Sequence, residues 1–393
     1  MAQAKEVAGR TGEQADSVHA GCQMLQLEPY TAPAWAATLK GVPRQRYRLA
    51  QLPTPVHPWA VPGLPPGCEL HIKRDDLTGM QLSGNKVRKL EFLLAEAREK
   101  GHDSVLTIGG IQSNHARATA VAARYLGMES HLILRNSDEL LDQDPGVTGN
   151  LLVERLVGAH IWQVSTEELM RLRSKGLGDA LAAQLRQRGL NPYFVALGGS
   201  SVLGVWGYLD MMRELEQQTA GQGFTDIAVA CGSSGTALGI ALGSRLAGPG
   251  LRVHAYCVCA SLAFFYRHCD MLLAELGAAP EVLGCSAEGL LRIVQAQGEG
   301  YAKSRPEELE CIAEVAAATG IILDPVYTGK ALHGLVSEMA ADPGAWAGRK
   351  VLFVHTGGLL GMYDKAAQLA PLVQRAGRAH RLTVPPAADG EAA

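Results

Sequence analysis

From residue 104 onward, short apolar runs alternate with segments of helical periodicity. Residues 104–108 form the first run, a helical pattern continues from there through Tyr125, and residues 131–134 form the second run. A helical segment over residues 150–157 then leads to a third run, residues 161–164. This alternation predicts β-α-β units, in which parallel strands are connected by helices that pack on the sheet.

The same rhythm resumes in the second half of the chain. Its apolar runs are residues 193–197, 226–230, 251–258 and 350–355. Several of these runs are apolar on both faces, which is typical of strands that are covered on both sides. Because 393 residues suffice for more than one core, we predict an α/β protein of two doubly wound domains with largely parallel sheets.

The two ends of the chain lack such a pattern. Residues 1–45 show no sustained period, and the C-terminal segment finishes in a run rich in proline, alanine and glycine, residues 383–393. Segments of this kind have little periodic apolar surface to bury. We therefore expect residues 1–45 to be poorly ordered or loosely docked, and residues 377–393 to form a flexible tail.

The composition argues against a large charged partner. The net charge is -3 and 19% of the residues are charged, so the chain has no electrostatic footprint for nucleic acid or an anionic membrane, and we expect a small-molecule substrate. No window reaches the eighteen or so apolar residues that a membrane-spanning helix needs. The first 21 residues include Glu6, Glu13 and Asp16, which is atypical of a transit peptide. This favours the cytoplasm and leaves an organelle such as the mitochondrion open.

The cysteines give no pattern typical of a metal site. The chain has eight, and only Cys257 and Cys259 lie close together in the sequence. Alternation along a strand would place these two side chains on the same face. We interpret the cysteines as reduced and mostly buried in the core, and we expect no metal.

Four strand-to-helix junctions are rich in small and hydroxyl-bearing residues. They are GGIQSNHARA after Ile108, GGSSVLG after Leu197, CGSSGTALG after Ala230 and HTGGLLG after Val354. Ligands of open α/β sheets collect at the carboxyl ends of the strands, and exposed amides at a helix start bind anions. Residues 232–236 could wrap one phosphate, although a tight turn explains them equally well. They match neither of the glycine-rich motifs of nucleotide-binding proteins.

The stretch SGNKVRKLEFL, residues 83–93, places a lysine directly after a Ser-Gly-Asn turn. A partly desolvated lysine beside a phosphate-bearing aldehyde can form a Schiff base, which is the chemistry of pyridoxal phosphate enzymes. Lys86 is the candidate for this role. Lys89 lies about one helical turn later and could offer its charge to the phosphate. The alternative is that Lys86 is an ordinary helix lysine that faces water.

Five motifs in this order resemble one family of pyridoxal phosphate enzymes. They are SGNKVRKLEFL, TIGGIQSNHAR, CGSSGTALG, ILDPVYTGKALHGL and VLFVHTGGLLGMYDK. Together they are similar to D-cysteine desulfhydrase and 1-aminocyclopropane-1-carboxylate deaminase, over roughly residues 48–376. The resemblance implies fold type II, that of the tryptophan synthase β subunit, and a homodimer. It also implies a large pyridoxal phosphate domain, residues 46–88 and 205–376, and a small α/β domain, residues 89–204.

The resemblance also implies the cofactor contacts. Lys86 is expected to hold pyridoxal 5'-phosphate as a Schiff base, and Lys89 to approach its phosphate. The remaining phosphate contacts are expected from Ser233, Ser234, Gly235 and Thr236. Asn114 is expected beside the cofactor ring, and Thr328 at the ring nitrogen.

For the substrate, the resemblance implies that Ser113 and the amides at the start of its helix bind the carboxylate, together with Asn114. Helix capping alone would also favour Ser and Asn at these positions. Tyr301 and Tyr327 match tyrosines that surround the substrate in this family, although a buried tyrosine with a satisfied hydroxyl would also fit. His115 follows the asparagine, as in the desulfhydrases, and its role could be packing.

Thr328 separates the two activities of the family. The deaminases have a glutamate here, which keeps the ring nitrogen protonated, whereas a threonine hydroxyl is neutral. Opening a cyclopropane ring needs the stronger electron sink, so Thr328 favours elimination from D-cysteine to give pyruvate, ammonia and hydrogen sulfide. Ser201 and the segment 260–262 depart from the desulfhydrase pattern. The alternatives are the deaminase, which gives 2-oxobutanoate and ammonia, and a catalytically silent amino-acid-binding protein.

Overall fold

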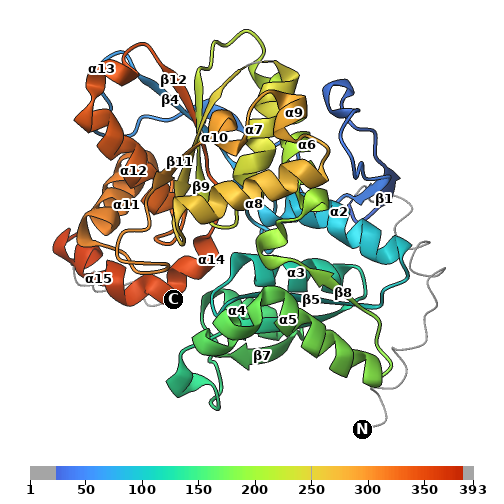
Figure 1. The fold of residues 1–393 in the computed structure, drawn as a ribbon. Coiled ribbons are helices and arrows are strands. Elements are labelled where there is room, and N and C mark those ends of the chain that lie inside the picture. The colour runs from blue at the N-terminus through green and yellow to red at the C-terminus, as the bar shows by residue number, and fades with distance from the viewer. Residues whose placement is uncertain (1–23, 249, 384–393) are drawn as a thin grey trace, which may run out of the picture.

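The computed structural model of the chain describes residues 24–248 and 250–383. This part of the chain contains three sheets and the helices around them: a six-stranded sheet in the upper half of the view, a four-stranded sheet in the lower half, and a small two-stranded sheet near the N-terminus (Figure 1). None of the described helices is long and apolar enough to cross a membrane.

The larger sheet has the strand order β11-β10-β9-β12-β4-β3. Its strands are β3 (Val56–Pro58), β4 (Glu69–Lys73), β9 (Asp226–Cys231), β10 (Arg252–Cys257), β11 (Arg292–Gln295) and β12 (Lys350–Val354). All neighbours pair in parallel except β3 with β4. Strands from both ends of the chain therefore lie side by side in this sheet.

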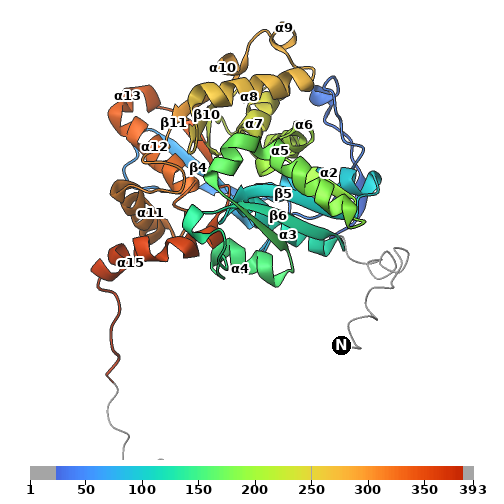
Figure 2. The ribbon, with the colours of Figure 1, turned by 60° about the horizontal axis from the view of Figure 1, so that its bottom comes forward.

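The smaller sheet has the order β7-β6-β5-β8 and is parallel throughout. Its strands are β5 (Ser104–Gly110), β6 (Glu129–Arg135), β7 (His160–Val164) and β8 (Pro192–Val195). Helix α5 (Thr166–Gln187) covers one face of β5 and β6, and α3 (Asn114–Tyr125) covers the other (Figure 2). The predicted β-α-β connections are confirmed here.

Both faces of the larger sheet are also buried. This explains why its strands do not alternate between apolar and polar residues. In β9, Ile227 and Val229 face the cluster formed with α6 (Val202–Thr219), α7 (Gly235–Ala247) and α8 (Leu262–Glu275). Ala228 and Ala230 face the opposite cluster, which includes α11 (Pro306–Thr319) and α12 (Thr328–Ala341). Side chains alternate along a strand, so apolar residues at every position fill two cores.

Helix α2 (Lys86–Glu99) contacts both halves of the structure. It packs on α6 beside the larger sheet and on α3 beside the smaller one. The strands of each sheet lie within the ranges that the sequence analysis assigned to the large and small domains. The division into two domains itself stays a prediction.

The N-terminal segment differs from the expectation. Residues 1–23 lie outside the described part, but residues 24–45 are docked on the protein rather than loose. β1 (Leu27–Pro29) pairs with β2 (Gln45–Tyr47), and Tyr30 packs edge-on against Phe92 at 4.8 Å between ring centroids. A few apolar side chains anchor this irregular segment, although its sequence has no hydrophobic periodicity. At the other end, residues 377–383 are exposed and have no helix or strand, and residues 384–393 lie outside the described part.

Candidate active site

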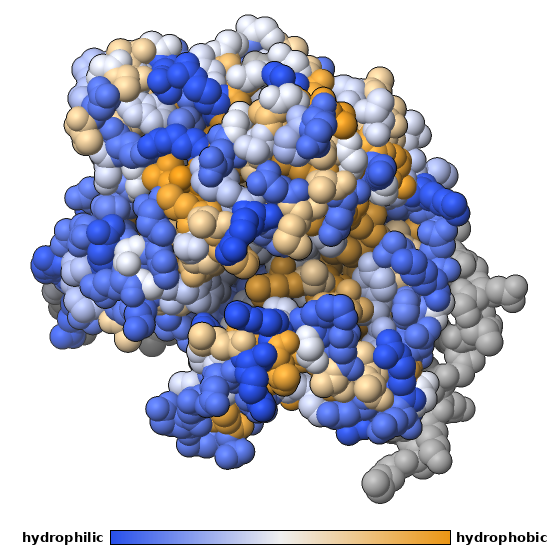
Figure 3. Space-filling view, viewed as in Figure 1, coloured by the Kyte–Doolittle hydropathy of each residue, from blue (hydrophilic) through white to orange (hydrophobic). Residues whose placement is uncertain are grey.

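A cavity lies between the two sheets, at the carboxyl ends of their central strands. The space-filling view is hollowed between the upper and lower halves of the molecule (Figure 3). All four glycine-rich junctions contribute residues to the cavity wall, so they converge as the sequence predicted. The same wall contains these candidate residues: Lys86, Ser113, Asn114, His115, Ser233, Ser234, Thr236, Tyr301 and Tyr327. Lys89, Gly235 and Thr328 lie behind it.

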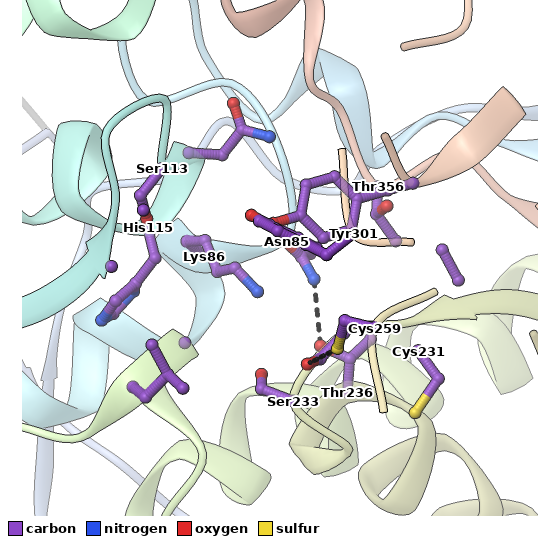
Figure 4. Close-up of a pocket in the computed structure, with 18 of the residues that line it drawn as sticks. Asn85, Lys86, Ser113, His115, Cys231, Ser233, Thr236, Cys259, Tyr301 and Thr356 are labelled. Atoms are coloured by element: carbon purple, nitrogen blue, oxygen red, sulfur yellow. Dashed lines mark hydrogen bonds between the residues drawn. The ribbon is translucent and has the colours of Figure 1, made fainter. Parts of the chain in front are cut away.

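The Ser-Gly-Asn turn aims Lys86 into the cavity. Gly84 has a φ of 104°, and a Cβ at this position would lie 2.7 Å from the carbonyl oxygen of Thr356. The backbone N–H of Asn85 donates to that same oxygen at 3.1 Å. Only glycine permits this approach, which fixes the start of α2 against the junction after β12. The amine of Lys86 then points between Ser113 on one side and Ser233 on the other (Figure 4).

The amine of Lys86 is poised to react. Burial lowers its pKa from 10.5 to about 8, and the nearby thiols of Cys231 and Cys259 oppose that shift only in part. At pH 7 about one amine in ten is then neutral, against about one in three thousand for a solvated lysine. A neutral amine is the nucleophile that attacks an aldehyde.

The loop after β9 presents hydroxyl protons to the cavity. The backbone N–H of Gly235 donates to Ser200 Oγ at 3.2 Å, and that hydroxyl donates to Ser233 Oγ at 2.9 Å. Thr236 Oγ1 accepts from Asn85 Nδ2 at 3.1 Å, a bond drawn in Figure 4. Because Ser233 and Thr236 each accept one of these bonds, each keeps its own proton to donate to a ligand.

Ser234, in the middle of this loop, has a different partner. Its Oγ is hydrogen-bonded to His268 Nδ1 at 2.6 Å and to the carbonyl oxygen of Ser233 at 2.7 Å. Its φ is 63°, which strains a residue with a Cβ by about 1–2 kcal/mol. Such strain persists where the surroundings impose it, frequently at a binding site. His268 holds the loop from α8, a helix that no motif of the sequence connected with the site.

Lys89 is a buried lysine behind this loop. It is completely buried, and its Nζ donates to the carbonyl oxygen of Gly198 at 3.1 Å. A Cβ on Gly235 would lie 3.2 Å from this Nζ. Burial and then the charge of Lys86 hold the pKa of Lys89 well below its usual value. Within residues 24–248 and 250–383 no carboxylate pairs with it, so an anion in the loop would stabilise its charged form.

Ser113 caps α3 at the edge of the cavity. Its Oγ accepts from the backbone N–H of Ala116 at 3.1 Å, which leaves the hydroxyl proton for a ligand. Asn114 Oδ1 accepts from Asn150 Nδ2 at 2.9 Å, so its own amide N–H groups stay available. His115 Nε2 is hydrogen-bonded to Thr107 Oγ1 at 2.9 Å. Burial beside two lysines holds the pKa of His115 well below its usual value, so its ring is neutral.

The two predicted tyrosines form a pair on the wall. The hydroxyls of Tyr301 and Tyr327 are hydrogen-bonded at 2.6 Å, and burial raises the pKa of both. Both are therefore protonated at neutral pH. A Cβ on Gly232 would lie 2.9 Å from the ring of Tyr327, so the ring rests on the backbone of the loop.

Thr328 lies one layer further out than the residues of the wall. It is completely buried, and its hydroxyl donates to Asp324 Oδ1 at 2.7 Å and accepts from the Asp324 backbone N–H at 2.9 Å. The hydroxyl that lines the cavity nearby belongs to Thr356, in the junction after β12. The sequence analysis named the junction HTGGLLG but did not select Thr356 as a site residue.

Other residues of the wall also escaped sequence reasoning. Asn85 stands inside a quoted motif, and Arg135 directly follows the predicted run 131–134, so a search at the carboxyl ends of the strands could have found Arg135. Cys259 gave no such signal. Burial raises the pKa of its thiol to about 12, so it is a neutral donor to the carbonyl oxygen of Gly232, at 3.1 Å. No carboxylate lines this cavity among the described residues, which makes it suited to anionic ligands.

Comparison with known proteins agrees with these observations. Residues 47–357 match the family described as pyridoxal-phosphate dependent enzyme. The bifunctional D-cysteine desulfhydrase/1-aminocyclopropane-1-carboxylate deaminase, mitochondrial, of Arabidopsis thaliana is 51% identical over 93% of this chain and 90% of its own. A D-cysteine desulfhydrase of Salmonella paratyphi A is 34% identical over 80% and 94%. The crystal structure of an ACC deaminase homologue superimposes with a TM-score of 0.73 at 34% identity, over 87% of this chain and 100% of that one.

Proposed function

Because the chain belongs to the pyridoxal-phosphate dependent enzymes, in fold type II, we propose that it is a D-cysteine desulfhydrase. The reaction converts D-cysteine and water into pyruvate, ammonia and hydrogen sulfide. The observation that carries the proposal is the Lys86 amine, with its pKa of about 8, facing a cavity that has unused hydroxyl donors and, among the described residues, no carboxylate.

The residues around the cavity fit a cofactor with one phosphate and one aldehyde. A Cβ on Gly198 would lie 2.2 Å from Ser233 Oγ, so the backbone approaches as closely as an anion cradle requires. Ser233 and Thr236 would donate to the phosphate, and Lys89 would gain from it the anion that it lacks. Lys86 would take the aldehyde.

When bound, pyridoxal phosphate supplies an electron sink that stabilises negative charge at the substrate Cα. The protein supplies the proton transfers. The pKa of the Lys86 amine, about 8, lies close to neutral, so we assign to this amine the removal of the Cα proton. The pair Tyr301 and Tyr327 stays protonated and would donate to charge that develops on the substrate.

The substrate carboxylate would be held at the start of α3. The hydroxyl proton of Ser113 and the amide of Asn114 are free to donate to it, and the helix N-terminus carries a partial positive charge that favours an anion. His115 is neutral and tied to Thr107, which supports a packing role for its ring.

The choice of elimination over ring opening rests on Thr328. Its side chain carries a neutral hydroxyl, which donates to Asp324 Oδ1 at 2.7 Å, at the position where the deaminases have a glutamate. A neutral partner does not enforce protonation of the ring nitrogen, and a weaker sink suffices when a thiolate leaves. The second candidate function is 1-aminocyclopropane-1-carboxylate deamination, since the name of the Arabidopsis relative states both activities.

The test is a parallel assay with D-cysteine, L-cysteine and 1-aminocyclopropane-1-carboxylate. We expect sulfide and pyruvate from D-cysteine, little from L-cysteine, and 2-oxobutanoate from the cyclopropane substrate at a far lower rate. Faster ring opening than desulfuration would replace the proposal by the deaminase. Cofactor binding without turnover of any of the three would favour a silent amino-acid-binding protein.

We further propose that the enzyme is a homodimer, which light scattering at several protein concentrations would test. For its location we propose the cytoplasm. The mitochondrial name of the Arabidopsis relative supports the organelle as the alternative, and cell fractionation decides between them.

A further inference from the structure

Arg135 is a cation at the cavity for which the proposed reaction has no use. It is the last residue of β6 and lines the inner cavity that holds Lys86. It also lines an outer cavity that shares Gly110, Asn114, Tyr301 and Tyr327 with the inner one, so it stands where the two meet. Its guanidinium lies over the ring of Tyr301, 5.8 Å from the centroid.

No anion in the described part of the chain neutralises Arg135. Asp324 and Asp364 line the outer cavity, but neither is within ion-pair distance of it; Asp364 pairs with Lys365 at 3.0 Å instead. A guanidinium is charged at every physiological pH and presents five donors in a fixed plane. This half-buried guanidinium lies over an aromatic ring and has no ion pair among the described residues, so it is ready to receive an oxyanion.

The anions of the proposed reaction already have partners. The cofactor phosphate would use Lys89 and the loop after β9, and the substrate carboxylate would use Ser113 and the start of α3. D-Cysteine brings no further permanent charge. A substrate that would use Arg135 must therefore carry a second anionic group in addition to its α-carboxylate.

We propose that this site also accepts β-substituted D-alanines whose β-substituent ends in an oxyanion, with Arg135 as the residue that selects them. The inference rests on the proposed function, because it uses the same elimination. The outer cavity gives such a substituent room beyond Tyr301, and polar residues such as Gln112 and Asn136 line it. The guanidinium would bind two oxygens of a sulfonate or phosphate side by side.

S-Sulfo-D-cysteine is the matched probe, because it differs from D-cysteine only by a sulfonate on the sulfur. In the elimination the Cα–H and Cβ–S bonds break and the Cα–Cβ double bond forms. The electron pair of the Cβ–S bond leaves with thiosulfate, and water hydrolyses the remaining enamine. The products are pyruvate, ammonium, thiosulfate and one proton, so no oxidant or reductant is needed.

The experiment compares both substrates in the holoenzyme and in Arg135→Gln, with thiosulfate and sulfide measured separately. We expect the wild type to release thiosulfate. In Arg135→Gln we expect kcat/KM for S-sulfo-D-cysteine to fall about tenfold to a hundredfold, mainly through KM, because a hydrogen-bonded ion pair is lost. The loss for D-cysteine should be at least tenfold smaller. Arg135→Lys keeps the charge without the planar fork and should lie in between.

Lys303→Gln is the control, because Lys303 lines the outer cavity but not the inner one. It should leave both substrates unaffected. An equal loss of kcat/KM for S-sulfo-D-cysteine in Lys303→Gln and Arg135→Gln would mean that any nearby positive charge attracts the substrate. This result would overturn the proposal. An equal loss for both substrates in Arg135→Gln would place Arg135 on the common carboxylate and overturn it as well.

The proposal and the function under it fail in different ways. A wild type that makes sulfide from D-cysteine, but neither turns over S-sulfo-D-cysteine nor is inhibited by it, refutes the role of Arg135 and leaves the desulfhydrase intact. A wild type that turns over neither substrate refutes the proposed function, and the inference with it.

Discussion

Replacing Thr236 with valine tests the phosphate cradle, because it removes one hydroxyl and keeps the shape of the side chain. Thr236 is 5% exposed, and its Oγ1 accepts from Asn85 Nδ2 at 3.1 Å. The variant loses the proton that we assign to the cofactor phosphate, and a hydrogen bond to a charged group is worth about 1.5–3 kcal/mol. At about 1.4 kcal/mol per decade, the affinity for pyridoxal phosphate should fall about tenfold to a hundredfold.

The same change leaves the buried Asn85 amide without its partner. An unsatisfied buried donor costs about 1–3 kcal/mol, so the apo protein should also lose stability. Ser244→Ala is the matched control. Ser244 lies on the same helix, is 1% exposed, and donates to the carbonyl oxygen of Leu251 at 3.3 Å, about two turns from the cavity. It should lower the melting temperature without changing cofactor affinity.

The assay is a titration of each apo protein with pyridoxal phosphate, followed by visible absorbance, with the melting temperature measured in parallel. Thr236→Ser should recover most of the affinity, because it restores the hydroxyl. If Thr236→Val binds as tightly as the wild type, the phosphate is held elsewhere. If Ser244→Ala loses as much affinity as Thr236→Val, the effect comes from the helix as a whole and the reasoning from the hydroxyl fails.

Three further predictions concern other parts of the site. Borohydride reduction of the holoenzyme should fix the cofactor on the peptide that contains Lys86, and the rate of attachment to the apo protein should rise with pH through about 8, where half of its amine is neutral, and level off above that pH; attachment to another lysine, or a rate independent of pH, would contradict the assignment. Thr328→Glu should slow sulfide release from D-cysteine and lower the melting temperature, because the new carboxylate is buried beside Asp324, and an unchanged sulfide rate would count against the role of the neutral hydroxyl. His268→Ala should weaken pyridoxal phosphate binding about threefold to tenfold, because Ser234 loses its 2.6 Å partner, while His268→Asn should restore part of it; equal affinities in all three proteins would make the contact incidental.

Much of the fold could be predicted because it follows from the local pattern of apolar residues. The runs at residues 104–108, 226–230 and 350–355 became β5, β9 and β12, since strands buried on both faces need apolar side chains at every position. Short strands carried no comparable signal. β3 has three residues and β11 has four, so their identity depends on the neighbouring strand that offers them hydrogen bonds.

The N-terminal segment shows the same limit. Phe92 and Trp206 lie against the ring of the buried Tyr30, and these residues come from α2 and α6. A sequence gives no way to see that partnership. The expectation of a loosely docked segment therefore failed for residues 24–45, although the segment has no regular pattern.

The sequence by itself determined which loops would meet and which lysine would enter the cavity, because the carboxyl ends of parallel strands converge and because the turn before Lys86 needs a glycine. The tertiary structure alone decided what stands around them. Arg135 and His268 come from elements that join the site only after folding, and a buried turn pairs the Thr328 hydroxyl with the Asp324 carboxylate. A side chain's hydrogen-bond partners, and the absence of an opposite charge beside it, depend on residues that are distant in the sequence and meet only in the folded protein. No single stretch of the chain therefore determines them.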